Sequence, residues 1–161
     1  MKPGRAALSI GVLSVLCSAC TPSIDLKQVL QLADTRGGWY DAGVVQGKNK
    51  LVPGVSFRLR KTGDADISQV SVNALFRAAD GVESGLDNDV FVQSVKFEGD
   101  QSEPVAVRSD NGYTAEPPQS RADMLKHGQF RDVRVQIFVK HGASQWIDLG
   151  RIDVRRQLIA Q

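Results

Sequence analysis

Cysteine is scarce in this sequence. Its two cysteines, Cys17 and Cys20, both lie close to the amino terminus of the 161-residue chain. The long segment after Cys20 can therefore form no internal disulfide, and it has no thiolate nucleophile and no cysteine ligand for a metal. We expect the stability of this segment to come from side-chain packing alone.

A net charge of either sign is also absent once the first 19 residues are set aside. Lys2 and Arg5 are the charged residues of that short segment, so 18 of the 20 Lys and Arg residues remain beside 18 Asp and Glu residues. Binding to nucleic acid depends on a basic surface that neutralises phosphates. The balanced charge therefore predicts no nucleic-acid partner.

Long hydrophobic runs are missing too. The most apolar stretch covers residues 6–16, well short of the roughly 20 residues that span a bilayer. It follows the basic residues Lys2 and Arg5, which is the layout of a bacterial secretory signal. We therefore interpret residues 1–19 as a signal peptide.

The end of this signal, Cys17-Ser18-Ala19-Cys20, resembles the lipobox of bacterial lipoproteins, although that family prefers Leu where Cys17 stands. The resemblance implies that a diacylglycerol is attached to the Cys20 thiol, after which the signal is removed. Thr21 follows, whereas Asp at that place commonly retains a lipoprotein in the inner membrane. The resemblance thus implies an outer-membrane lipoprotein facing the periplasm. Cleavage after Ala19 without lipidation, or an uncleaved membrane helix, are the alternatives.

Short segments with alternating apolar and polar residues dominate the chain after this region. Such period-two alternation is typical of strands with one buried face. A change in apolar parity across Gly150 and Arg151 indicates a β-bulge. The predicted strands cover residues 39–45, 55–60, 70–77, 90–98, 105–107, 133–140 and 146–154.

About seven short strands with turns between them predict an all-β fold. One short helix is expected over residues 120–128, and residues 24–34 fit either a helix or a strand. Two antiparallel sheets packed face to face would bury the apolar faces, which is an immunoglobulin-like β-sandwich. A closed barrel of the lipocalin type is the alternative. We assign residues 20–35 to the lipidated cysteine and a tether, and residues 36–161 to the sandwich.

Catalytic and metal-binding patterns are weak. Ser144, His141 and Asp148 contain the groups of a hydrolytic triad, but their spacing does not favour one, and no Gly-x-Ser-x-Gly motif is present. The acidic turns at residues 87–89 and 110–111 lack the Gly and Glu of a calcium loop. We expect no enzymatic activity, no cofactor and no metal; a hydrolase is a minor alternative.

The few amphipathic rings are the better candidates for binding. Trp39 and Trp146 fit a core position better than an exposed one, whereas turn residues around Arg108 and Tyr113, up to Pro117-Pro118, favour an exposed loop. Residues 145–154 are the candidate sheet edge for strand addition. The candidate binding surface consists of Trp39, Tyr40, Arg108, Tyr113 and His141.

Four runs of sequence carry a further resemblance, to a group of uncharacterised bacterial envelope lipoproteins. They are residues 38–43, 50–53, 108–109 with 112–114, and 138–142. The resemblance implies a β-sandwich lipoprotein and no mechanism. We therefore predict a membrane-anchored, non-enzymatic binding or structural module with a protein partner in the envelope. A lipid- or glycan-binding transport component, which would need a cavity or an aromatic platform, is the alternative.

Overall fold

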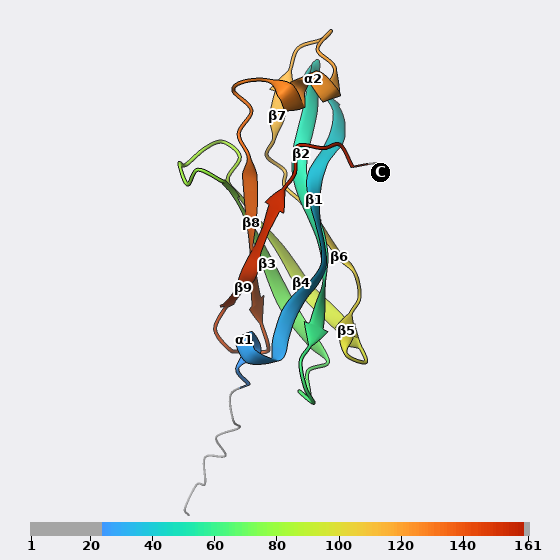
Figure 1. Ribbon diagram of the computed structural model, residues 1–161, viewed down its shortest axis with the longest axis vertical. Helices are drawn as coiled ribbons and strands as arrows, with labels where there is room; N and C mark the ends of the chain where they lie inside the picture. The colour runs from blue at the N-terminus through green and yellow to red at the C-terminus, as the bar shows by residue number, and fades with distance from the viewer. Residues whose placement is uncertain (1–23, 160–161) are drawn as a thin grey trace, which may run out of the picture.

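The computed structural model describes residues 24–159, which form a nine-stranded antiparallel β-sheet with two short helices (Figure 1). The predicted signal peptide and Cys20 lie outside the described residues. The all-β class is confirmed, with more strands than expected and a second helix. The elements are α1 (Leu26–Val29), β1 (Leu30–Val45), β2 (Lys48–Lys61), β3 (Gln69–Ala78), β4 (Asn88–Glu98), β5 (Gln101–Ser102), β6 (Val105–Arg108), β7 (Tyr113–Ala115), α2 (Arg121–Lys126), β8 (Val133–Lys140) and β9 (Ile147–Val154).

The first half of the sheet is one long hairpin, β1 and β2, joined at Gln46 and Gly47. Both turn residues have positive φ, 52° and 78°, as the tight two-residue hairpin turn requires. The segment that fitted either a helix or a strand contains both, since α1 leads directly into β1. Leu26 and Leu30 are buried in the core. The folded part therefore begins before residue 36, the boundary predicted from the sequence.

The strands follow the order β1-β2-β5-β4-β3-β8-β9, and β6 and β7 also pair with β2. The two terminal strands, β1 and β9, pack against each other and bring the sheet close to a closed barrel. After β9 the chain runs parallel to β1, where the N–H of Trp39 donates to the carbonyl of Gln157 (2.8 Å) and the N–H of Ile159 donates to the carbonyl of Trp39 (2.8 Å). Within the described residues β9 itself pairs with β8 alone and packs beside β1 at its other edge, so strand addition there stays a prediction.

Alternate side chains along the strands fill the interior. In β8, the predicted inward residues Val133, Val135, Ile137 and Val139 are all buried, with exposed fractions of 1% or less. Each such side chain contributes about 1.5–3 kcal/mol relative to an exposed position. The predicted bulge is confirmed as well, because Ile137 pairs with Gly150 and Phe138 with Asp148, which leaves Leu149 as the extra residue.

The predicted helix over 120–128 is present as α2. The Ser120 hydroxyl caps it by accepting a hydrogen bond from the Asp123 N–H (3.1 Å). The helix buries Met124 and Leu125 against the sheet. Neither helix within residues 24–159 has the length and hydrophobicity needed to traverse a bilayer.

Candidate functional site

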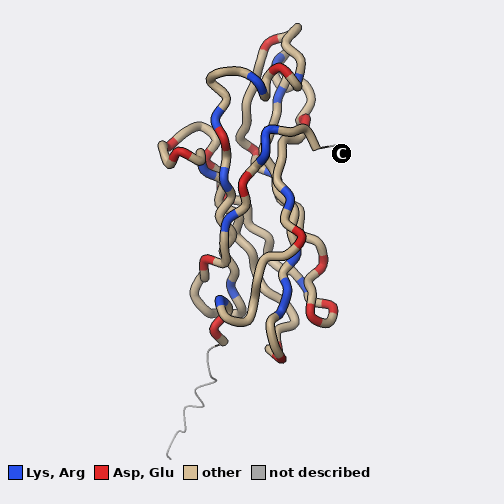
Figure 2. The backbone as a smooth tube through the Cα atoms, in the orientation of Figure 1, with Lys and Arg blue, Asp and Glu red and all other residues tan. Residues whose placement is uncertain are grey.

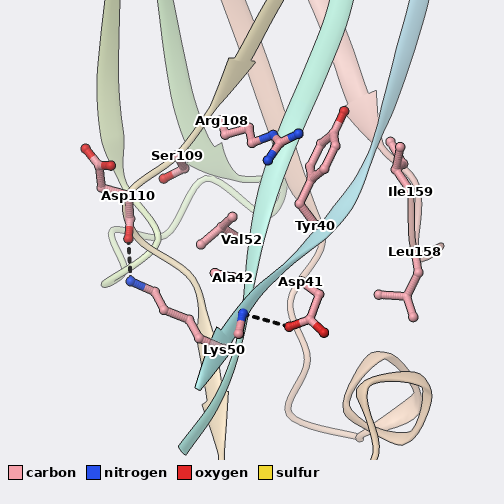
Figure 3. A pocket seen from close by; sticks show the side chains of 11 residues that line it. Tyr40, Asp41, Ala42, Lys50, Val52, Arg108, Ser109, Asp110, Leu158 and Ile159 are labelled. Carbon is pink, nitrogen blue, oxygen red and sulfur yellow. Dashed lines mark hydrogen bonds between the residues drawn. The ribbon is translucent and has the colours of Figure 1, made fainter. Parts of the chain in front are cut away.

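An open groove of about 1090 Å³ lies on the outer face of the β1–β2 hairpin, between the chain after β6 and the chain after β9 (Figure 3). Both apolar and charged side chains line it. The lining residues used below are Tyr40, Asp41, Lys50, Val52, Arg108 and Ile159.

Strand register places Tyr40 and Arg108 on the same face. Tyr40 pairs with Val52 across β1 and β2, and Arg108 pairs with Gly54 across β6 and β2. Residues two apart on a strand share a face, so all four positions point outward. Their neighbours Trp39 and Val55 point into the core, where both are fully buried.

Gly54 makes room for the tyrosine ring. A Cβ atom at this position would lie 2.5 Å from Cε2 of Tyr40 and 3.0 Å from the carbonyl oxygen of Val107. The ring therefore rests directly on the β2 backbone, and Tyr40 as a residue is only 8% exposed. Above it, the guanidinium carbon of Arg108 lies 3.9 Å from the ring centroid, which is a cation–π contact.

Among residues 24–159, no carboxylate forms an ion pair with the Arg108 guanidinium. The nearby Asp41 carboxylate accepts from Nε of Arg121 (3.0 Å) and from the Gly43 N–H (2.8 Å). Nζ of Lys50 donates to the backbone carbonyl of Asp110 (2.7 Å). In Figure 3 the Asp110 carboxylate lies beyond Ser109, away from the Tyr40–Arg108 stack. The donors of Arg108 are thus available to an external anionic group.

Of the predicted binding residues, Trp39 belongs to the core instead, and Tyr113 is half-buried and packs against the core. Trp39 is fully buried, as the sequence favoured, and its ring lies 5.7 Å from that of Tyr113. Tyr113 pairs with the buried Leu51, so its side chain points inward and stacks on Phe130 at 4.3 Å. Its hydroxyl accepts from the Arg131 N–H. The expectation that the loop around Arg108 and Tyr113 forms one exposed surface is wrong, because the two face opposite sides of the sheet.

His141 lies at the other end of the molecule, in the β8–β9 connection (Figure 1). The Ser144 hydroxyl there accepts from the backbone N–H of His141 (3.2 Å), and the Asp148 carboxylate accepts from the Gln136 amide (2.7 Å). These contacts do not assemble the triad that could be drawn from the sequence. In the described part of the chain, no three acidic, histidine or cysteine side chains gather into a metal site.

Two ion pairs outside the groove shift the pKa values of their side chains. The hydrogen bond from Arg131 holds the pKa of the Asp80 carboxyl below its usual value, and the same bond raises the pKa of Arg131. The hydrogen bond with Asp132 likewise raises the pKa of Arg156. These pairs join the β3–β4 loop and the C-terminal segment to the chain before β8, and Figure 2 shows acidic and basic residues interspersed over the backbone.

Lys50, Val52 and Ile159 line the groove but were not recognised from the sequence. Lys50 and Val52 lie in β2, in a part of it that no predicted strand covered. Ile159 reaches the groove only because the chain after β9 lies along β1. No local sequence pattern predicts this pairing between distant segments. Parts of three of the four sequence runs that carried the envelope-lipoprotein resemblance, from residues 38–43, 50–53 and 108–109, come together around this groove.

Known proteins do not identify the chain. No protein-family model matches it, and no curated protein and no solved structure shows significant similarity to it. The groove with its Tyr40–Arg108 stack is therefore the feature on which a functional proposal rests.

Proposed function

We propose that this protein is a non-enzymatic binding module of the cell envelope that holds a partner protein in the groove beside Tyr40 and Arg108. The observation that carries the proposal is a guanidinium stacked 3.9 Å above an aromatic ring, without a carboxylate partner in residues 24–159. Guanidinium groups bind carboxylates through two parallel hydrogen bonds. The partner then presents an Asp or Glu to Arg108 and an apolar side chain to Val52 and Ile159.

Preorganisation supports Arg108 as the anchor of this interface. A free arginine side chain carries about 2 kcal/mol of rotamer entropy, part of which is lost when it is fixed on binding. The Tyr40 ring already restrains Arg108 before a partner arrives. A hydrogen bond to a charged group contributes about 1.5–3 kcal/mol, so the anchor needs apolar contacts around it for stable binding.

We expect Arg108→Glu to abolish partner capture. A photoreactive residue in place of Ala42, which lines the groove, should crosslink one partner in the native envelope. Charge reversal at Arg108 should lower this crosslink about tenfold or more, since it removes the anchor and repels the carboxylate. The measurement is crosslink yield by immunoblot, with mass spectrometry of the adduct.

Arg151→Glu is the matched control, because Arg151 is an exposed arginine on β9, away from the groove. It should leave the crosslink unchanged. Equal yields from wild type and Arg108→Glu, with both proteins melting cooperatively, would remove the groove as the binding site.

We also propose that the protein is exported, lipidated on Cys20 and held at the outer membrane, facing the periplasm. The basic start, the short apolar run and the residues before Cys20 support this. Two or three acyl chains hold a protein firmly at a membrane, because each buried methylene contributes about 0.8 kcal/mol. Intact-mass analysis of protein purified from its host should reveal a chain that begins at residue 20 and carries acyl chains, and Cys20→Ala should release it from the membrane. An unacylated amino terminus would refute the proposal.

An immunoglobulin-like arrangement is the finer fold that we propose. In it, one layer consists mainly of β3, β4, β8 and β9, and the other of β1, β2, β6 and β7. The pairing of β3 with β4 and β8 on one side, and of β2 with β1 and β6 on the other, supports two layers. Large residues from both sets, such as Phe57 and Phe76, meet in the core.

A transport role for a lipid or a glycan receives less support. Such a role favours an internal cavity, but central side chains from several strands are 1% exposed or less. The outer groove, by contrast, is open to solvent. Recognition at the surface therefore fits the molecule better than enclosure of a ligand.

A further inference from the structure

A pair of aromatic rings is exposed on the outer face of the second half of the sheet. Phe91 on β4 is 57% exposed and Trp146, just before β9, is 39% exposed. Their centroids lie 5.9 Å apart in an edge-to-face arrangement, and Nζ of Lys140 lies 5.4 Å from the Trp146 ring. The core position that the sequence favoured for Trp146 is therefore wrong. The two rings contact each other, yet much of their apolar surface is exposed to water.

On this outer face the exposed rings lie from the middle of the strands toward the β8–β9 connection, and ion pairs lie toward the other end. Strand register aligns Phe91 with Phe138 through Asn73, close to the β8–β9 connection. Toward the opposite end of the same strands, the exposed positions form ion pairs. These are Arg134 with Asp153 (2.7 Å) and Arg77 with Asp87 (3.9 Å).

The β8–β9 connection, which contains Trp146, lies at the end at which the chain leads back to Cys20. Helix α1 packs against β9, and Figure 1 shows it beside the β8–β9 connection. Ile24, which precedes α1, is 38% exposed. Four residue steps separate Ile24 from Cys20, and these span at most about 14 Å when fully extended. Acyl chains on Cys20 would hold this end of the domain within that distance of a bilayer.

We propose that Phe91, Trp146 and Lys140 form a docking face for the lipid bilayer at its headgroup level; this inference rests on the proposed lipidation of Cys20. Tryptophan prefers this zone because its ring is apolar while its N–H can still bind water or headgroups. Lysine extends its charged end toward phosphates from an apolar stem. Exposed rings beside a lysine, with the Asp148 carboxylate accepting from Gln136 and the whole face tethered by so short a segment, match the chemistry of that surface.

The proposed docking also orients the binding groove. The groove lies toward the other end of the molecule, near the described C-terminal segment (Figure 1). A domain that rests on the bilayer through Phe91 and Trp146 holds Tyr40 and Arg108 away from the lipid. The groove is then open to a partner in the aqueous compartment.

The test uses the full-length lipidated protein in vesicles of phosphatidylethanolamine and phosphatidylglycerol, prepared with or without bromine on the acyl chains. Bromine quenches tryptophan emission on contact. Because Trp39 is buried in the core, we expect quenching to affect Trp146 alone, by about half for a ring at the interface. Trp146→Phe should abolish the quenching, and Phe91→Ser should reduce it at least twofold. Val82→Ser, which alters another exposed apolar residue, in the β3–β4 loop, should not change it.

The outcomes separate the docking face from the anchor. Protein that carries acyl chains and floats with the vesicles, yet emits equally with brominated and plain lipid, would overturn the docking face and leave the anchor intact. Protein without acyl chains would overturn both. Quenching that persists in Trp146→Phe would assign the contact to another part of the molecule and overturn the inference as well.

Discussion

Replacing Trp39 with alanine should lower the free energy of unfolding by about 3–5 kcal/mol, the largest loss that we expect from one substitution. Trp39 is completely buried, and its ring contacts Phe130 at 4.5 Å and Tyr113 at 5.7 Å. Its backbone also pairs with Gln157 and Ile159, where the C-terminal segment approaches β1. A cavity at this point would weaken the packing of the core and the pairing of the C-terminal segment with β1.

Urea unfolding measured by circular dichroism tests this expectation. Trp39→Phe should cost less than Trp39→Ala, because Nε1 of Trp39 has no hydrogen-bond partner in the described structure and most of the ring volume is kept. The matched control is Trp146→Ala, at a partly exposed position, which should cost less than about 1 kcal/mol. Comparable losses at the two tryptophans would contradict the buried position of Trp39.

Gly112→Ala should produce the second large effect, a loss of about 1–3 kcal/mol through overpacking. A Cβ atom on Gly112 would lie 2.0 Å from the carbonyl oxygen of Leu51 and 3.0 Å from Cα of Val52. Both are backbone atoms of β2, so no side-chain rotation can relieve the contact. The chain entering β7 would have to move away from β2, and Val52 lines the groove. We therefore expect partner crosslinking to fall together with stability.

Gly128→Ala serves as the control for Gly112→Ala. Apart from its two neighbours in the chain, no residue has an atom within 4 Å of a Cβ atom at Gly128, so the same substitution should change stability by less than about 1 kcal/mol. Thermal and urea unfolding of both variants, with crosslinking from Ala42, would measure the two effects. A Gly112→Ala protein as stable as Gly128→Ala would contradict the close approach of β7 to β2.

Local sequence patterns were sufficient to predict most of the strands. The alternation in residues 133–140 predicted β8, because a strand with one buried face has a period of two whatever its partners are. The parity change near Gly150 predicted the bulge for the same reason. Polar residues around Met124 and Leu125 likewise predicted α2, whose cap, Ser120, lies within the predicted segment.

The two tryptophans illustrate what such patterns leave open. Trp39 and Trp146 had similar local surroundings in the sequence, and a core position was favoured for both. One is fully buried and the other is 39% exposed. The exposure of each tryptophan ring depends on which strands cover it. Pairing between segments that are distant in the sequence decides which strands these are.

The sequence by itself determined the all-β class, the positions of most strands, and the charge balance. These depend on periodicity and composition, which are properties of neighbouring residues. Only the tertiary structure decided that Tyr40 and Arg108 meet over Gly54, that Ile159 joins them, and that Tyr113 turns inward. Contacts across so many residues are set by strand register and by the near closure of the sheet, because pairing one residue out of register would turn each side chain to the opposite face.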